Sequence, residues 1–134
     1  MPTVFPFHSA LYASLSMLLL TVLAMRTTML RRRHHVFAGH GGVPALQAAS
    51  RMHGVSFEHL LPLILMLCFF EALGGQTLWV DVFGGAILVG RLVQVIGWVT
   101  KTKLRQAGMG LTYLLEISLP LAVLWEVLQR LNHA

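Results

Sequence analysis

Charge and cysteine are scarce in this sequence of 134 residues, and both shortages limit what the protein can be. Only 11% of the residues are charged, whereas 56% are hydrophobic and the mean hydropathy is +0.71. A water-soluble core of this length does not require so many apolar residues. The composition therefore argues against a water-soluble globular protein and indicates that lipid is the solvent.

The one cysteine, Cys68, has no second cysteine with which to pair. The chain therefore forms no internal disulfide, and it has too few thiolates for a zinc site built on cysteine. Cys68 lies within an apolar run, so we interpret it as a small buried hydrophobic residue.

Four apolar runs are long enough to cross a bilayer, which requires about 20 residues per helix. They cover residues 7–30, 46–73, 78–99 and 111–131. Glycine, proline or cations separate them at residues 34–44, 74–75 and 101–110. The first run is followed, not preceded, by arginines, so it is an anchor and not a secretory signal. We predict an all-α membrane protein in which residues 1–134 form a single domain, a bundle of four transmembrane helices.

The basic residues predict the orientation of this bundle. Arginines at 31–33 follow the first run, and Lys101, Lys103 and Arg105 follow the third. The connection after the second run is flanked by Glu71 and Asp81. By the positive-inside rule, the first and third connections are cytoplasmic and both termini are outside. Because the cations cluster beside apolar runs, the pI near 10.4 indicates topology and not a nucleic-acid partner.

Several polar residues lie inside the predicted spans, where each ionisable group costs free energy and suggests a functional site. They are Arg51, His53, Glu58, His59, Arg91, Gln94, Tyr113 and Glu116.

Arg51 and Glu58 share one face of the second span, about 10 Å apart along the helix. We take this separation as too long for the usual ion pair of one turn and suited to a small zwitterion or peptide. On the third span, Arg91, Gln94 and Trp98 align. This stripe reaches Arg105 if the helix continues past Lys101.

Three further interpretations of the polar residues concern a structural ion pair, a metal site and a catalytic triad. The alternative to a ligand site is that Glu58 or Glu116 neutralises Arg51 or Arg91 as a buried structural pair. We expect this structural role for Glu116 and Arg91, and we favour the ligand site for Arg51 and Glu58. His53 and His59 point about 120° apart around the helix, so we predict no metal site on the second span. No serine, histidine and acid share an arrangement that would form a catalytic triad.

Two segments resemble motifs of the MAPEG superfamily, the membrane-associated proteins in eicosanoid and glutathione metabolism. Residues 51–62 (RMHGVSFEHLLP) resemble its second-helix motif, and residues 91–98 (RLVQVIGW) resemble its third-helix pattern. Arg105 stands where the catalytic arginine would. The stretch from Gly39 to Gly54 resembles the small bacterial inner-membrane branch of this superfamily.

The resemblance implies a homotrimer in the cell inner membrane, with glutathione as co-substrate bound between subunits at the cytoplasmic side. It implies a transferase or peroxidase that acts on lipophilic electrophiles or lipid hydroperoxides. Arg105 would stabilise the glutathione thiolate. The residues implied to bind or support glutathione are Arg31, Arg51, Glu58, His59, Arg91, Gln94 and Trp98.

The sequence departs from the family pattern at several site positions, among them Gln94 and Trp98, which replace aromatic residues, often tyrosine. Val55 stands where an asparagine is usual and His59 where a tyrosine is usual, so a non-catalytic lipid-binding or scaffold protein is the alternative. A small multidrug transporter would carry an acid in its first span, which has none. The expected partners are membrane lipids, a lipophilic substrate and further copies of the chain.

Overall fold

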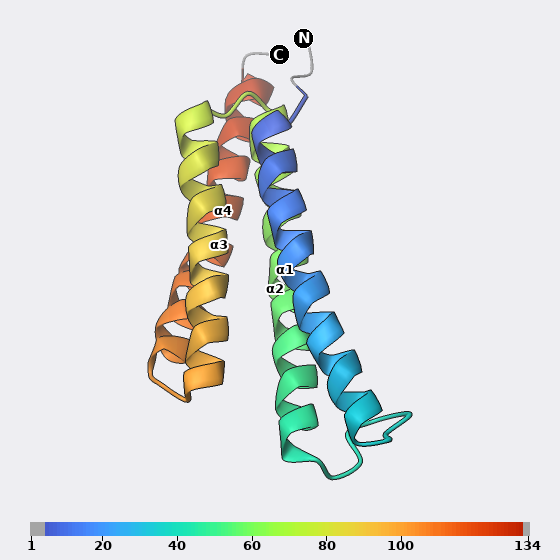
Figure 1. Cartoon of the computed structure of the whole chain (residues 1–134). Helices are drawn as coiled ribbons and strands as arrows, with labels where there is room; N and C mark the ends of the chain where they lie inside the picture. Colours follow the sequence, from blue (N-terminus) through green and yellow to red (C-terminus); the bar gives the residue numbers. More distant parts are fainter. Residues whose placement is uncertain (1–4, 133–134) are drawn as a thin grey trace.

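The computed structural model describes residues 5–132, which form four long helices and the short connections between them (Figure 1). These helices are α1 (Phe7–Arg33), α2 (Pro44–Ala72), α3 (Thr77–Thr100) and α4 (Leu104–Asn132). By length and composition, each is apolar enough to cross a membrane. The prediction of an all-helical chain with four such helices is therefore confirmed.

The helices form two antiparallel hairpins, α1 with α2 and α3 with α4, and packing within each hairpin is more extensive than packing between them (Figure 1). Within the described residues, α1 does not contact α4. The end at which α1 begins and α4 ends is called the closed end. The opposite end carries connections 34–43 and 101–103 and is called the basic end. Figure 1 shows the two hairpins diverging toward the basic end.

The start of α4 was predicted wrongly. Residues 101–110 were expected to form a connection because they contain three cations and two glycines, but α4 begins at Leu104. Lys101 adopts a left-handed conformation (φ 55°) that ends α3, so the stripe on α3 stops at Trp98 and Arg105 belongs to α4. Only residues 101–103 connect the two helices.

Gly108 lies inside α4 because α3 passes very close to it. A Cβ at this position would lie 2.6 Å from the backbone nitrogen of Gln94 and 2.6 Å from the carbonyl oxygen of Gly90. Small residues allow helix backbones in membranes to approach in this way. Gly108 therefore serves helix packing and does not break the helix.

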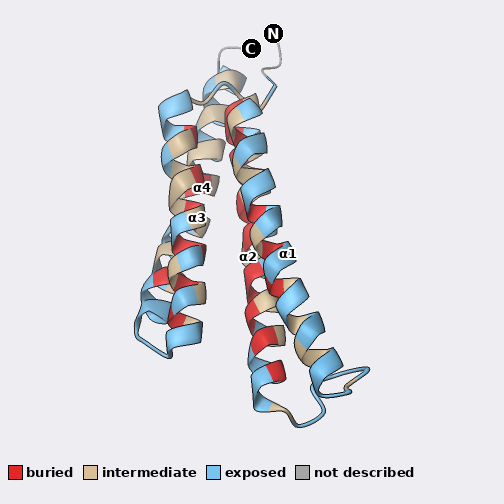
Figure 2. Cartoon of the chain, in the orientation of Figure 1, coloured by how far each residue is buried: buried red, intermediate tan, exposed pale blue. Residues whose placement is uncertain are grey.

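Buried residues follow α2 and one side of α3, whereas α1 is largely exposed (Figure 2). The apolar core lies between the two hairpins in the half of the bundle near the closed end. Its buried members are Leu20, Leu60, Leu63, Leu67, Phe70, Val80, Ile87, Leu115 and Leu119. Many large apolar side chains point outward, as expected of helices that face lipid or other subunits.

Polar contacts fix the closed end. The carboxylate of Glu71 is buried and accepts hydrogen bonds from the backbone N–H of His8 (3.0 Å) and of Ser9 (2.6 Å). It thereby satisfies donors at the start of α1, where no side chain of α1 itself caps the helix. Asp81 contacts His8 Nδ1 (2.9 Å), and Arg130 donates to the carbonyl oxygen of Leu73.

Candidate functional site

Arg51 and Glu58 form an ion pair on the outer face of α2. Arg51 Nη1 lies 3.7 Å from Glu58 Oε1. The expectation that these two groups are too far apart to meet was wrong, because both side chains are long and extend toward each other over two helical turns. The helical face they share was predicted correctly.

The position of Glu58 along α2 bears on how the exposure of this ion pair is interpreted. Glu58 lies thirteen residues before Glu71 of the closed end, which corresponds to about 20 Å along the helix. If the hydrocarbon layer, about 30 Å thick, begins at Glu71, then it includes Glu58 and ends near Arg51. Yet the side chains of Arg51 and Glu58 are 63% and 58% exposed in the single protomer. Exposed charges are costly in hydrocarbon, so this exposure is unusual for a helix face that meets lipid.

A first cleft of about 590 Å³ lies at the basic end, beside this pair. Arg51 and Gln47 of α2 line it together with Arg31 of α1, His40 of the connection and Trp98 of α3. Nη1 of Arg31 donates a 2.6 Å hydrogen bond to the carbonyl oxygen of Gly39, which fixes the connection against α1. Glu58 lies outside this lining and reaches the cleft through its contact with Arg51.

A second cleft of about 510 Å³ adjoins the first, and the two share Ala48 and Trp98. Lys101, Lys103 and Arg105 line it. The guanidinium carbon of Arg105 lies 4.3 Å from the ring centroid of Trp98, a cation–π contact. Trp98 thus lines the first cleft together with Arg51 and the second together with Arg105. Four of the predicted site residues, Arg31, Arg51, Trp98 and Arg105, therefore line two adjoining clefts.

Arg91 and Gln94 do not line these clefts. Arg91 is fully buried and Gln94 is 2% exposed, both in the seam between α3 and α4. Nη2 of Arg91 donates a 2.5 Å hydrogen bond to the hydroxyl of Thr112. Its Nε and Nη1 have no partner among the described residues, and neither does Oε1 of Gln94. These two side chains stand behind the clefts, where they support α3 from within the bundle.

His59 contacts Glu116 of α4, with 2.5 Å between Nδ1 and a carboxylate oxygen. Glu116 was expected to neutralise Arg91 as a buried pair. Its short contact goes to His59 instead, and it acts on Arg91 through its charge without a salt bridge between the two. The ring of Tyr113 packs edge-on against His59, with 5.8 Å between the ring centroids. The sequence does not reveal this contact, because it depends on how α2 packs against α4 and on no local spacing.

The fold and the site together define a bundle of four membrane-spanning helices with charged clefts at one end. Residues 9–125 match the MAPEG family, and the chain belongs to that family. The chain is 36% identical over 118 residues to inner membrane protein YecN of Escherichia coli strain K12, which covers 87% of this chain and 90% of that protein. The protein of the same name from E. coli O6:H1 strain CFT073 matches to the same extent. No solved structure matches.

Proposed function

We propose that this protein is a glutathione-dependent transferase or peroxidase of the bacterial inner membrane, acting on lipophilic electrophiles or lipid hydroperoxides. The observation that carries the proposal is the exposed Arg51–Glu58 pair, next to clefts lined by Arg31 and Arg105. The relatives from E. coli are named inner membrane proteins. The basic connections then face the cytoplasm, where glutathione is available, and both termini lie outside.

The exposure of this pair supports a homotrimer. A neighbouring protomer placed against the outer face of α2 would keep lipid away from Arg51 and Glu58 and leave a polar space open to the cytoplasm. The apolar surface that surrounds the pair on α2, including Phe57 and Leu61, would be buried in the same contact. Each active site would then lie between two copies of the chain.

The charges around the clefts complement glutathione. The tripeptide carries two carboxylates, one ammonium group and one thiol. Arg51 and Arg31 offer guanidinium donors that suit carboxylates, and Glu58 offers an acceptor for the ammonium group. Arg51 and Glu58 pair with each other in the protomer, so ligand binding would replace one ion pair by two.

Arg105 would activate the thiol. A free thiol has a pKa of about 8.5 and is mostly protonated at neutral pH. A guanidinium beside the sulfur stabilises the thiolate, and each unit of pKa depression corresponds to about 1.4 kcal/mol. The thiolate sulfur then attacks the electrophile, which reaches it laterally from the bilayer, and the leaving group departs with the electron pair of the broken bond.

Glutathione titration of the purified protein tests the proposal. Near-ultraviolet absorbance reports the thiolate and calorimetry reports binding. We expect both signals in the wild type, and loss of the thiolate signal with retained binding in Arg105→Ala. Arg26→Ala is the matched control, since it removes an arginine of α1 outside both clefts. Absence of both signals in the wild type contradicts the proposal.

A non-catalytic lipid-binding or scaffold protein is the second candidate, and two observations favour it. Val55 is 5% exposed and apolar where the family pattern has asparagine, and the His59 ring is held by Glu116. Both reduce the hydrogen bonds that are available to glutathione. This candidate gains support if the wild type binds no glutathione while retaining its oligomeric state.

A further inference from the structure

A pocket of about 390 Å³ lies at the closed end of the bundle, at the opposite end from the two clefts. We call it the closed-end pocket. Four aromatic rings, one amide and one carboxylate line it, from Phe70, Trp79, Phe83, Trp125, Gln76 and Glu126. Phe70 is 5% exposed, whereas Trp79 and Trp125 are 51% and 63% exposed. The pocket therefore leads from the surface of the bundle to a buried ring.

Three of the rings pack against one another in different orientations. The ring centroids of Phe70 and Phe83 lie 5.9 Å apart with an angle of 81° between the ring planes. Those of Phe83 and Trp79 lie 6.3 Å apart, and the planes meet at 40°. Gly75 makes room for Phe70, because a Cβ at this position would lie 2.5 Å from a ring carbon. With Trp125 added from α4, the pocket has the composition of an aromatic cage.

Glu126 gives the closed-end pocket its charge. Its carboxylate is half-buried and takes part in no hydrogen bond or ion pair within residues 5–132. Arg130, one turn further along α4, lies outside the lining and donates to the carbonyl oxygen of Leu73. The lining contains no cationic side chain. The pocket therefore combines aromatic rings with one carboxylate that the described protein leaves without a partner.

We propose that the closed-end pocket binds a small alkylated ammonium cation from the aqueous side of the closed end. The alkyl groups would lie against the rings and the positive charge near Glu126. Aromatic faces attract such cations, and the attraction increases where water is excluded. An alkylated ammonium group needs few hydrogen-bond acceptors, and the side chains of the lining supply them only at Gln76 and Glu126. A Ca²⁺ ion takes six to eight oxygen ligands, which this lining does not offer.

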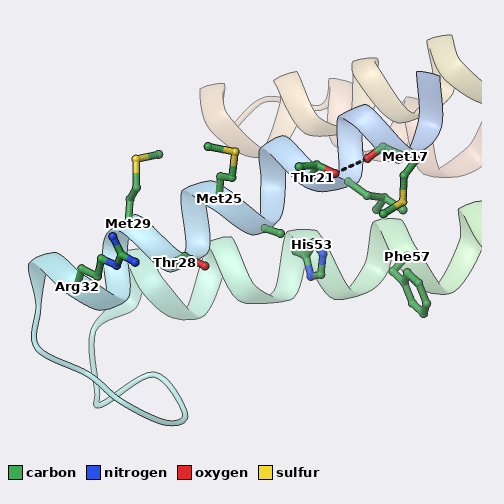
Figure 3. Close-up of a pocket in the computed structure, with 10 residues that line it drawn as sticks. Met17, Thr21, Met25, Thr28, Met29, Arg32, His53 and Phe57 are labelled. Carbon is green, nitrogen blue, oxygen red and sulfur yellow. Dashed lines mark hydrogen bonds between the residues drawn. The ribbon is translucent and has the colours of Figure 1, made fainter. Parts of the chain in front are cut away.

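The larger groove between α1 and α2 has the opposite charge (Figure 3). Its lining contains Arg32 and His53 and no carboxylate. A cation would be repelled by Arg32 in that groove and attracted by Glu126 in the closed-end pocket. No residue of the closed-end pocket lines either cleft at the basic end. The proposed cation site is therefore separate from the proposed glutathione site and does not depend on it.

The exposed tryptophans have a simpler interpretation that the test must exclude. Tryptophans near helix ends commonly anchor membrane proteins at the interface with water. Anchoring alone does not require Trp79 of α3 and Trp125 of α4 to share one pocket with a carboxylate. An anchor also has no preference for a charged ligand over a neutral one of the same shape. A comparison of two such ligands therefore separates the two roles.

Choline and 3,3-dimethyl-1-butanol provide this comparison, because they have similar shapes and only choline is charged. The purified full chain is titrated with each compound in maltoside detergent, and calorimetry and tryptophan fluorescence report binding. We expect choline to bind about tenfold more tightly than the alcohol, and Glu126→Gln to weaken choline binding about tenfold. Asp81→Asn is the matched control. It makes the same charge change at the closed end outside the pocket, and we expect it to retain choline binding.

Two further variants test the rings. We expect Trp125→Leu to weaken choline binding about fivefold and Trp125→Phe, which keeps a ring, to retain most of it. Circular dichroism and the oligomeric mass establish that each variant remains folded and assembled.

Four outcomes would overturn the proposal. They are no choline binding by the wild type, equal affinity for choline and the alcohol, unchanged binding in Trp125→Leu, and equal losses in Glu126→Gln and Asp81→Asn. The third would leave Trp125 as an interface anchor, and the fourth would indicate net charge alone. The choline comparison in the wild type decides the question even if a variant fails to fold. None of these outcomes depends on glutathione binding.

Discussion

His59 of α2 and Glu116 of α4 are joined by a contact of 2.5 Å, and this contact takes the carboxylate that Arg91 was expected to use. Arg91 is fully buried, and its hydrogen bond goes to the hydroxyl of Thr112. Glu116 therefore joins α4 to α2, whereas Arg91 joins α3 to α4 through Thr112.

We expect Glu116→Leu to destabilise the bundle by about 1–3 kcal/mol, because it removes the hydrogen bond to His59 and the negative charge near Arg91. Unfolding in mixed detergent micelles measures the loss. A double-mutant cycle with His59→Leu isolates the direct contact. If the two losses simply add, the contact contributes nothing to stability and our account of this pair is wrong.

Gly108 and Gly110 of α4 provide a matched pair. We expect Gly108→Ala to cost about 1–3 kcal/mol, because its Cβ would meet the backbone of α3 at 2.6 Å. No atom lies within 4 Å of a Cβ at Gly110, so Gly110→Ala should gain up to about 1 kcal/mol of helix propensity. The same unfolding measurement serves both variants. Equal effects at the two positions would argue against the close approach of α3 and α4.

Glu71 caps α1 from another helix, so its removal should be costly. We expect Glu71→Ala to lower stability by about 2–3 kcal/mol, since the N–H groups of His8 and Ser9 lose their buried acceptor. Asp81→Ala is the comparison, because Asp81 also contacts His8 but is half exposed and screened by solvent. Hydrogen exchange at the start of α1 should rise mainly in the Glu71 variant. A larger effect from Asp81 would contradict this assignment of the cap.

Exchanging the charges of Arg51 and Glu58 separates a structural pair from a ligand site. The double variant Arg51→Glu with Glu58→Arg keeps an ion pair on the same face but reverses its direction along α2. We expect stability close to that of the wild type and a loss of glutathione affinity of at least tenfold, about 1.4 kcal/mol or more. Calorimetry measures the affinity. Wild-type affinity in the exchanged protein would mean that neither side chain contacts the ligand.

The apolar runs predicted the fold well because each helix must span the same thickness of lipid. α1, α2 and α3 begin and end within three residues of the predicted bounds. The start of α4 was missed because a glycine pattern has two physical meanings. At Gly39 it allows a left-handed backbone in a connection, and at Gly108 it allows a close approach between helices. The sequence around one glycine does not distinguish these cases, because the second depends on a partner helix.

The sequence predicted those features of the site that depend on one helix and missed those that depend on packing between helices. Helical periodicity placed Arg51 and Glu58 on one face, and this is a local property of α2. Whether two long side chains meet depends on their rotamers, and the partner of Glu116 depends on how α2 packs against α4. The burial of Arg91 likewise follows from the tight seam between α3 and α4. These features arise from packing between helices, which spacing along one helix does not encode.

The two hairpins diverge, so the residues that hold them together and the residues that line the clefts lie at opposite ends of the bundle. Contacts that hold the hairpins together lie toward the closed end, in the core and around Glu71. The clefts and their cations lie at the basic end. Exposed cleft side chains such as Arg51 and Arg105 can therefore be replaced without loss of the apolar core. Relatives with the same scaffold are free to diverge in what they bind.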